Sequence, residues 1–155
     1  TDSYIIVQEV VRTLMPLADQ KNIAINNHVE HGLMLQTDPS LLRIVIQNLV
    51  ANGIKFTNEG GFVDISTRLV QKSRLQIEVA DSGTGMSLDV VKRINDGLKI
   101  ESSRGTNNES GTGLGLLICK EFINHLGGEF RVVSKEGQGS TFIISLPISS
   151  TNDMI

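Results

Sequence analysis

The sequence predicts an α/β sandwich of two layers, in which a mixed, mostly antiparallel sheet is covered on one face by about three helices. Apolar residues recur at helical spacing in residues 3–20, after Asp38 and after Leu114. Two pairs of segments alternate between apolar and polar residues, as strands do: 62–69 with 75–79, and 129–134 with 141–146. The links within each pair are short, which favours antiparallel pairing.

The composition indicates one globular domain with an aliphatic core. The 155 residues are 39% hydrophobic and 20% charged, and they include no Trp and a single Tyr. A net charge of −3 without a basic stripe argues against a nucleic-acid partner. No apolar run approaches the roughly 18 residues of a membrane span. No Cys or His group has the spacing of a zinc site, and the lone Cys119 is expected in the core.

The N-terminal part of the chain is expected to form a helix followed by a hairpin. Residues 3–20 carry an apolar stripe, and Pro16 is expected to kink this helix or to close it early. The short apolar runs 23–25 and 33–35 are separated by polar turn residues, which favours a pair of strands. Because the chain begins inside the helical pattern, we expect it to be a fragment of a longer protein.

The second helix carries an unusual polar flank. Asp38 and Pro39 form a strong helix start, as the N-cap and the first helical residue. Asn48, Asn52 and Lys55 then fall within about 60° of one another at the edge of the apolar arc. A solvated polar surface would account for them. The alternative is a pocket for phosphate and metal, because Mg²⁺ takes oxygen ligands and Lys neutralises phosphate.

An aspartate stands at the end of the 75–79 strand pattern and is followed by glycines. Asp81 is separated from Gly83 and Gly85 by two and four positions. Its carboxylate could accept a hydrogen bond from an amino group, while the glycines let a flat ring lie against the backbone. An Asp-initiated turn without a ligand explains the same pattern. A short helix is then expected from Ser87 to about residue 95.

A glycine-rich run leads into the last helix. Gly111, Gly113 and Gly115 stand at alternate positions ahead of a helical pattern. Such a loop at a helix N-terminus presents free N–H groups and a positive dipole end to a phosphate. A turn that packs the helix against the sheet is the alternative. The preceding residues 98–112 are almost free of hydrophobic side chains, which makes them a candidate lid.

Together, the order and spacing of these motifs resemble the catalytic and ATP-binding domain of sensor histidine kinases, within the wider group that includes gyrase, Hsp90 and MutL. Residues 48–57 resemble the N box of that family, residues 81–86 its first glycine box and residues 111–116 its second. The closing residues 139–147 match as well. The resemblance covers nearly the whole chain and implies ATP and Mg²⁺ as cofactors.

The resemblance implies roles for individual residues. Asn52 would coordinate Mg²⁺, and Asn48 would lie beside the phosphates and the metal. Lys55 would contact phosphate, so Asn48 and Lys55 would be catalytic through positioning and charge neutralisation. Asp81 would bind the adenine amino group, and Arg104 or Thr106 in the lid could reach the terminal phosphate. The other implied nucleotide contacts are Phe56, Gly83, Gly85, Met86, Gly111, Gly113, Leu114, Gly115, Leu116 and Thr141.

The resemblance also implies a reaction and partners. Related ATPases carry a Glu at the position of Asn48, which can act as a general base, whereas an amide cannot. The implied reaction is therefore transfer of the γ-phosphoryl group to a histidine on a dimerisation domain absent from this chain. The downstream partner would be a response regulator, and the parent would be a homodimeric, membrane-anchored sensor whose isolated cytoplasmic domain is monomeric. A nucleotide-binding module without kinase activity and a gyrase-type ATPase are the alternatives.

Two features depart from the family pattern. Gly53 stands where the family usually has Ala, which is expected to cost helix stability. The phenylalanine-containing box before the lid is not recognisable, since Leu98 and Ile100 are the only apolar candidates. The sequence therefore does not predict how the lid is anchored. The implied ATP-binding domain spans residues 1–148, with a tail or linker over 149–155.

Overall fold

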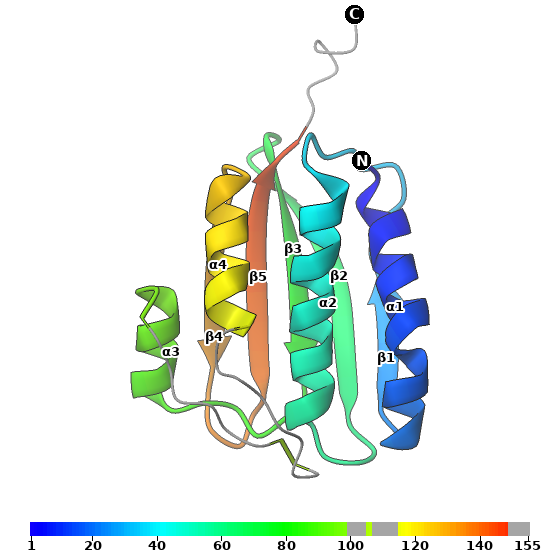
Figure 1. Ribbon diagram of the computed structural model, residues 1–155, viewed down its shortest axis with the longest axis vertical. Helices are drawn as coiled ribbons and strands as arrows, with labels where there is room; N and C mark the ends of the chain where they lie inside the picture. The colour runs from blue at the N-terminus through cyan, green and yellow to red at the C-terminus, as the bar shows by residue number, and fades with distance from the viewer. Residues whose placement is uncertain (99–104, 107–114, 149–155) are drawn as a thin grey trace, which may run out of the picture.

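A computed structural model describes residues 1–98, 105–106 and 115–148. Figure 1 shows a layer of helices in front of a sheet. The elements in chain order are α1 (Ser3–Gln20), β1 (Ala24–His28), α2 (Pro39–Phe56), β2 (Phe62–Val70), β3 (Arg74–Asp81), α3 (Leu88–Asn95), α4 (Gly115–His125), β4 (Glu129–Ser134) and β5 (Ser140–Pro147).

The sheet is mixed and mostly antiparallel, which confirms the prediction. Its strand order is β1-β2-β3-β5-β4, and only the β1–β2 pair is parallel among the described strands. Both predicted antiparallel pairs, β2 with β3 and β4 with β5, are present. In this register Asp81 lies between Val63 on one side and Ser140 on the other. The end of the central strand is therefore enclosed by its two neighbours.

The predicted hairpin of residues 23–25 and 33–35 is wrong. Strand β1 pairs in parallel with β2 instead, and α2 forms the connection between them. Met34 and Leu35 form only isolated bridges elsewhere. Leu35 is fully buried in the core. The apolar run at 33–35 therefore reflects burial against other elements, which a local pattern does not distinguish from a strand.

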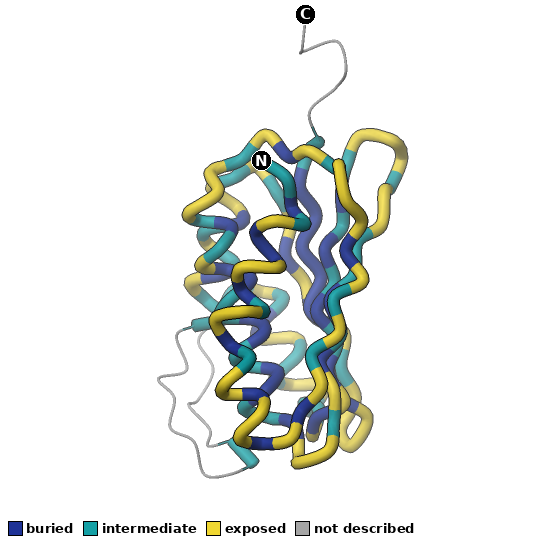
Figure 2. The backbone as a smooth tube through the Cα atoms, turned by 90° about the vertical axis from the view of Figure 1, so that its right-hand side faces the viewer, coloured by how far each residue is buried: buried dark blue, intermediate teal, exposed yellow. Residues whose placement is uncertain are grey.

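Helices α1, α2 and α4 cover one face of the sheet, and α3 lies beside its β4 edge (Figures 1 and 2). The described residues thus form four helices, three of which cover the sheet as predicted. The Asn95 side chain attaches α3 to the edge strand: its Nδ2 donates to Val132 O at 3.1 Å, and its Oδ1 accepts from Val132 N at 2.8 Å. This carboxamide pairs main-chain groups that an edge strand would otherwise leave open.

Side chains cap the helices at the predicted positions. Asp38 accepts hydrogen bonds from two N–H groups of the first turn of α2, at 2.8 and 3.3 Å. Ser87 caps α3 in the same way. In α1, however, Pro16 lies inside the helix, which continues to Gln20 rather than closing early.

Aliphatic side chains fill the space between the two layers. Figure 2 shows the buried residues of the helices facing the buried residues of the sheet. Cys119 is fully buried, and burial raises the pKa of its thiol to about 12, so it is a packing residue as predicted. Among the described residues, no helix has the length and the apolar character needed to cross a bilayer.

Gly53 lies where α2 approaches β2 and β3. A Cβ atom at this position would be 3.2 Å from Val63 Cγ2 and 3.5 Å from Asp81 Cβ. The glycine therefore has a packing role that the sequence did not reveal, in addition to its cost in helix propensity. It brings the backbone of α2 close to the end of the central strand.

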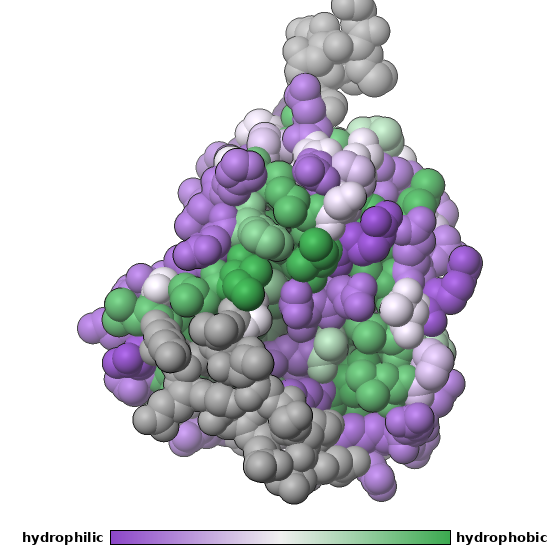
Figure 3. All heavy atoms as spheres, viewed as in Figure 1, coloured by the Kyte–Doolittle hydropathy of each residue, from purple (hydrophilic) through white to green (hydrophobic). Residues whose placement is uncertain are grey.

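The helical face also exposes apolar side chains. Figure 3 shows them over α2 and α4. These helices carry Ile44 and Ile118, which are 44% and 40% exposed. Clustered apolar side chains on a surface are typical of contacts with a protein partner.

Candidate functional site

The polar flank of α2 lies on the side of the helix that is turned away from the core. Asn48, Asn52 and Lys55 are all partly exposed, whereas the buried residues of α2 face the sheet. Spacings of four and three residues place the three side chains on successive turns of one face. The structure therefore brings them together as the periodicity predicts.

Asn48 faces the start of α4. Its Nδ2 donates to the carbonyl oxygen of Ile44 at 2.9 Å, which fixes the carboxamide and turns Oδ1 outward. A Cβ atom on Gly115 would lie 3.8 Å from this oxygen. An anion bound by the first turn of α4 would therefore lie beside the amide oxygen of Asn48.

The last turn of α2 is attached to the loop that follows β3. The carbonyl oxygen of Phe56 accepts from the N–H of Thr84 at 3.0 Å. A Cβ atom on Gly83 would come within 2.5 Å of the same oxygen, so only glycine permits this approach. Lys55 Nζ lies 4.8 Å from the centroid of the Phe56 ring. The ammonium group and the ring are thus held next to the glycine loop.

Asp81 is a buried carboxylate with one oxygen committed to the main chain. It is 8% exposed, and its Oδ1 accepts from the N–H groups of Gly83 at 2.9 Å and Ser140 at 3.3 Å. Burial raises the pKa of this carboxyl group, and the two hydrogen bonds partly oppose the shift. Oδ2 accepts no hydrogen bond from the described residues, so it is available to an external donor.

Two serines connect the glycine loop to Asp81. The N–H of Met86 donates to Ser134 Oγ at 2.8 Å, and Ser134 Oγ donates to the carbonyl oxygen of Gly139 at 2.9 Å. Ser134 Oγ and Ser140 Oγ are 2.8 Å apart, and Ser140 carries the N–H that reaches Asp81. Neither serine is among the site residues that the sequence predicts.

Close backbone packing explains two of the glycines in this region. Gly85 and Gly139 have φ angles of +70° and +84°. A Cβ atom on Gly85 would overlap the carbonyl oxygen of Lys135, and one on Gly139 would overlap that of Asp81. The glycine loop and the β4–β5 hairpin therefore form one closely packed unit.

Ser140, rather than Thr141, lies beside Asp81. Successive strand residues point to opposite faces, and Ser140 is opposite Asp81 on the buried face, whereas Thr141 is opposite Ala80. The side chain of Thr141 therefore lies on the opposite face of the sheet from that of Asp81, and its nucleotide contact stays a prediction. Ser140 is two residues from the buried Phe142, so the alternation of the strand places it on the same, core-facing side. A serine at a core-facing position could have identified it from the sequence.

Thr106 lies at the C-terminal end of α2. Its N–H donates to the carbonyl oxygen of Lys55 at 3.0 Å, and its Oγ1 donates to that of Thr57 at 3.0 Å. It is therefore next to Lys55, although its hydroxyl bonds to the main chain. Leu116 is partly buried in the first turn of α4. Four further predicted site residues lie outside the described residues: Arg104, Gly111, Gly113 and Leu114.

The oxygen atoms available at this site suit a magnesium ion that arrives bound to a phosphate ligand. The described residues contain no group of three His, Cys, Asp or Glu side chains that could hold a metal. The amides of Asn48 and Asn52 instead offer neutral oxygens, and Mg²⁺ usually keeps several waters and binds substrate phosphates. The site could therefore hold a phosphate–metal group beside α2 and an amino group at Asp81.

Comparison with known proteins identifies related sequences. A family model described as "Histidine kinase-, DNA gyrase B-, and HSP90-like ATPase" matches residues 37–150. The sensor protein GacS of Pseudomonas syringae pv. syringae is 34% identical over 153 residues, which is 96% of this chain and 17% of GacS. This chain therefore spans about a sixth of the length of that relative.

Solved structures with the same fold include ShkA and the histidine kinase ThkA. Full-length ShkA, in complex with AMPPNP, has a TM-score of 0.79 and 29% identity, over 97% of this chain and 31% of ShkA. The nucleotide-free catalytic domain of histidine kinase ThkA has a TM-score of 0.81 and 25% identity, over 95% of this chain and 93% of that domain. ThkA has also been solved with the response regulator TrrA. These comparisons confirm the predicted sandwich fold.

Proposed function

This chain belongs to the family of histidine kinase-, DNA gyrase B- and HSP90-like ATPases, and on that premise we propose that it binds ATP with Mg²⁺ and donates the γ-phosphoryl group to a histidine. The observation that carries the proposal is that two features occur together: Asp81, with one free carboxylate oxygen, and the polar flank of Asn48, Asn52 and Lys55 on α2. Gly53 brings the helix close to the aspartate, so both belong to one continuous site.

Asp81 would receive the adenine amino group. Two main-chain N–H groups orient its Oδ1, so Oδ2 can accept from the base without a change of rotamer. Gly83 and Gly85 let the loop that would lie beside the ring pack closely against the backbone of Phe56 and Lys135. Met86 and Phe56 would complete the walls of the base pocket.

Asn52 and Asn48 would supply neutral oxygens to Mg²⁺ and the phosphates. The neutral amide of Asn52 adds no repulsion to the triphosphate, as a carboxylate at this position would. Lys55 would neutralise phosphate charge, and the first turn of α4 at Gly115 and Leu116 would donate main-chain N–H groups. Asn52 and Asn48 would hold Mg²⁺, which when bound would supply positive charge that offsets the phosphates during transfer.

The side chain of Asn48 favours phosphoryl transfer over hydrolysis. A carboxylate could take a proton from water, whereas the amide of Asn48 cannot, and its Nδ2 is already bonded to Ile44 O. The γ-phosphoryl group would therefore pass to an imidazole nitrogen of a histidine, leaving ADP. The described residues contribute positioning and charge neutralisation to this step.

The acceptor histidine would lie on a dimerisation domain of the same parent protein. The exposed apolar side chains over α2 and α4 support a protein partner (Figure 3). We further propose a response regulator as the downstream partner and a cytoplasmic position for this domain within a membrane-anchored, homodimeric sensor. The complex of ThkA with TrrA supports the first of these.

Labelled ATP tests the reaction. The domain is mixed with a purified helical domain that bears the acceptor histidine, and acid-labile phosphate on that domain is measured. Phosphohistidine supports the kinase. ATP binding without phosphohistidine would favour a nucleotide-binding module, and steady ATP turnover by this chain alone would favour a gyrase-type ATPase.

Asn52→Asp is expected to weaken ATP·Mg²⁺ binding about 10- to 100-fold, because it adds a negative charge within a few ångströms of the phosphates. Isothermal titration calorimetry gives the dissociation constants. Asn124→Asp is the matched control, since it makes the same charge change at an exposed position in the last turn of α4. Equal affinities of the two variants would contradict the role of Asn52.

A further inference from the structure

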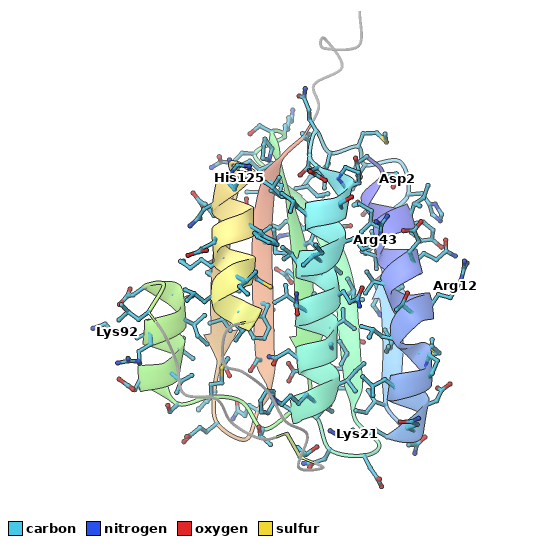
Figure 4. All side chains as sticks on the ribbon, in the orientation of Figure 1. Asp2, Arg12, Lys21, Arg43, Lys92 and His125 are labelled. Atoms are coloured by element: carbon cyan, nitrogen blue, oxygen red, sulfur yellow. The ribbon has the colours of Figure 1, made fainter. Side chains whose placement is uncertain are left out.

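Lys21 is a buried cation at the end of the first helix. It is 4% exposed and occupies the C-cap position of α1, outside the residues 37–150 that match the family model. Figure 4 shows it beside the C-terminal end of α2. Lysine is seldom buried to this degree unless its ammonium group has polar partners.

The ammonium group of Lys21 donates to the last turn of α2. Its Nζ lies 2.8 Å from the carbonyl oxygen of Ile54 and 2.8 Å from that of Lys55. The last carbonyl groups of a helix lack partners within the helix and carry the negative end of its dipole. A buried ammonium group at this position therefore both satisfies and electrostatically stabilises the helix end.

The last turn of α2 is held by three segments that are distant in sequence. The ammonium group of Lys21 donates to Ile54 O and Lys55 O, and the N–H of Thr84 donates to Phe56 O. Thr106 donates to Lys55 O through its N–H and to Thr57 O through its hydroxyl group. The side chains of Lys55 and Phe56 project from this same turn. The orientation of the turn therefore decides where both side chains point.

We propose that Lys21 is a positioning residue for nucleotide binding, which fixes the last turn of α2 so that Lys55 reaches the phosphates. This inference rests on the proposed ATP-binding function. Without the ammonium group, the carbonyl oxygens of Ile54 and Lys55 would each lose a charged donor. They would keep neutral donors, among them the main-chain N–H groups of Thr57, at 3.4 Å, and Thr106, at 3.0 Å, so the turn would shift or fray. Lys55 would then spend less time at the phosphates, although its own charge is unchanged.

Calorimetry with ATP·Mg²⁺ on the whole chain tests the proposal. Lys21→Met keeps the length of the side chain and removes the ammonium group, and we expect it to weaken binding roughly 30-fold. Lys120→Met is the matched control, because Lys120 also donates to two carbonyl groups, of Asn95 and Phe130, but these belong to α3 and β4 rather than to α2. It is expected to change affinity about twofold or less. Lys21→Gln, which retains a donor, is expected to be intermediate and replaces Lys21→Met if that variant does not fold.

A double-mutant cycle separates positioning from general destabilisation. If Lys21 acts through Lys55, removing the Lys55 ammonium group by Lys55→Met should abolish most of the effect of Lys21→Met on ATP affinity. A purely structural role would weaken binding by the same factor in both backgrounds. Thermal unfolding of every variant confirms that each titration is done on folded protein.

The outcomes distinguish this inference from the function on which it rests. Loss of affinity in Lys21→Met that largely disappears in the Lys55→Met background supports positioning. Unchanged affinity in Lys21→Met, or an equal loss in both backgrounds, overturns the inference while ATP binding by the wild type stands. A wild-type chain that does not bind ATP overturns the proposed function and this inference together.

Discussion

Asp81→Asn is expected to lower ATP affinity about 100-fold or more while the nucleotide-free domain stays folded. The asparagine oxygen would keep the hydrogen bonds from the N–H groups of Gly83 and Ser140. Its amide nitrogen would then occupy the position of Oδ2 and present a donor to the donating amino group of adenine. The variant therefore replaces an attraction with a mismatch, which calorimetry with ATP·Mg²⁺ would measure.

The same variant should be at least as stable as the wild type without nucleotide. Burial raises the pKa of Asp81 above its usual value of 3.8, despite two hydrogen bonds that lower it. Between the unfolded and folded pKa values the folded state binds more protons, so stability falls as pH rises through this interval. Thermal unfolding across that pH range should show this loss in the wild type and not in Asp81→Asn.

Asp64→Asn is the matched control for both measurements. It removes the same charge from the neighbouring strand, at a residue opposite Ala80 and therefore on the other face of the sheet. Its ATP affinity should be close to that of the wild type. If Asp81→Asn also kept its affinity, the assignment of Asp81 to the base would be refuted.

Gly139→Ala is expected to destabilise the domain by about 3 kcal/mol or more and to weaken ATP binding in the molecules that remain folded. Gly139 has a φ of +84°, and a Cβ there would overlap the carbonyl oxygen of Asp81. The hairpin would have to move away from β3, and the N–H of Ser140 would move with it. The free energy of unfolding from urea titration measures the first effect, and calorimetry the second.

Gly137→Ala separates the steric effect from the backbone effect. Gly137 lies in the same turn with a similar φ of +77°, but a Cβ there would meet nothing within 4 Å. It should therefore cost only about 1 kcal/mol, from the left-handed conformation alone. Similar losses of stability in the two variants would show that the contact of the hairpin with Asp81 does not matter.

Much of the candidate site could be predicted because it depends on local periodicity. Asp38 and the apolar positions after it define the start and the buried face of α2, and these in turn define the flank of Asn48, Asn52 and Lys55. The position of Asp81 at a strand end also follows from local alternation. The structure confirms these features because each of them depends only on residues within one helix or strand.

Features that depend on pairing between distant segments could not be predicted in this way. Strand β1 pairs with β2, which follows it in the chain only after α2. The apolar run at 33–35 therefore does not pair with β1, although its local pattern resembles a strand. The choice between Ser140 and Thr141 depends on the register of β5 against β3. A shift of one residue exchanges the two faces of a strand, and no local pattern specified that register here.

The sequence by itself determined the class of fold, the family resemblance and the chemical groups of the candidate site, because these depend on residue types and on spacing along one chain segment. Only the tertiary structure decided which hydrogen bonds from distant segments hold those groups in position. Lys21 continues the buried stripe of Leu14 and Ala18, yet its partners lie on another helix. A buried charge can be recognised from its position in a sequence, but the carbonyl groups that satisfy it come together only when the chain folds.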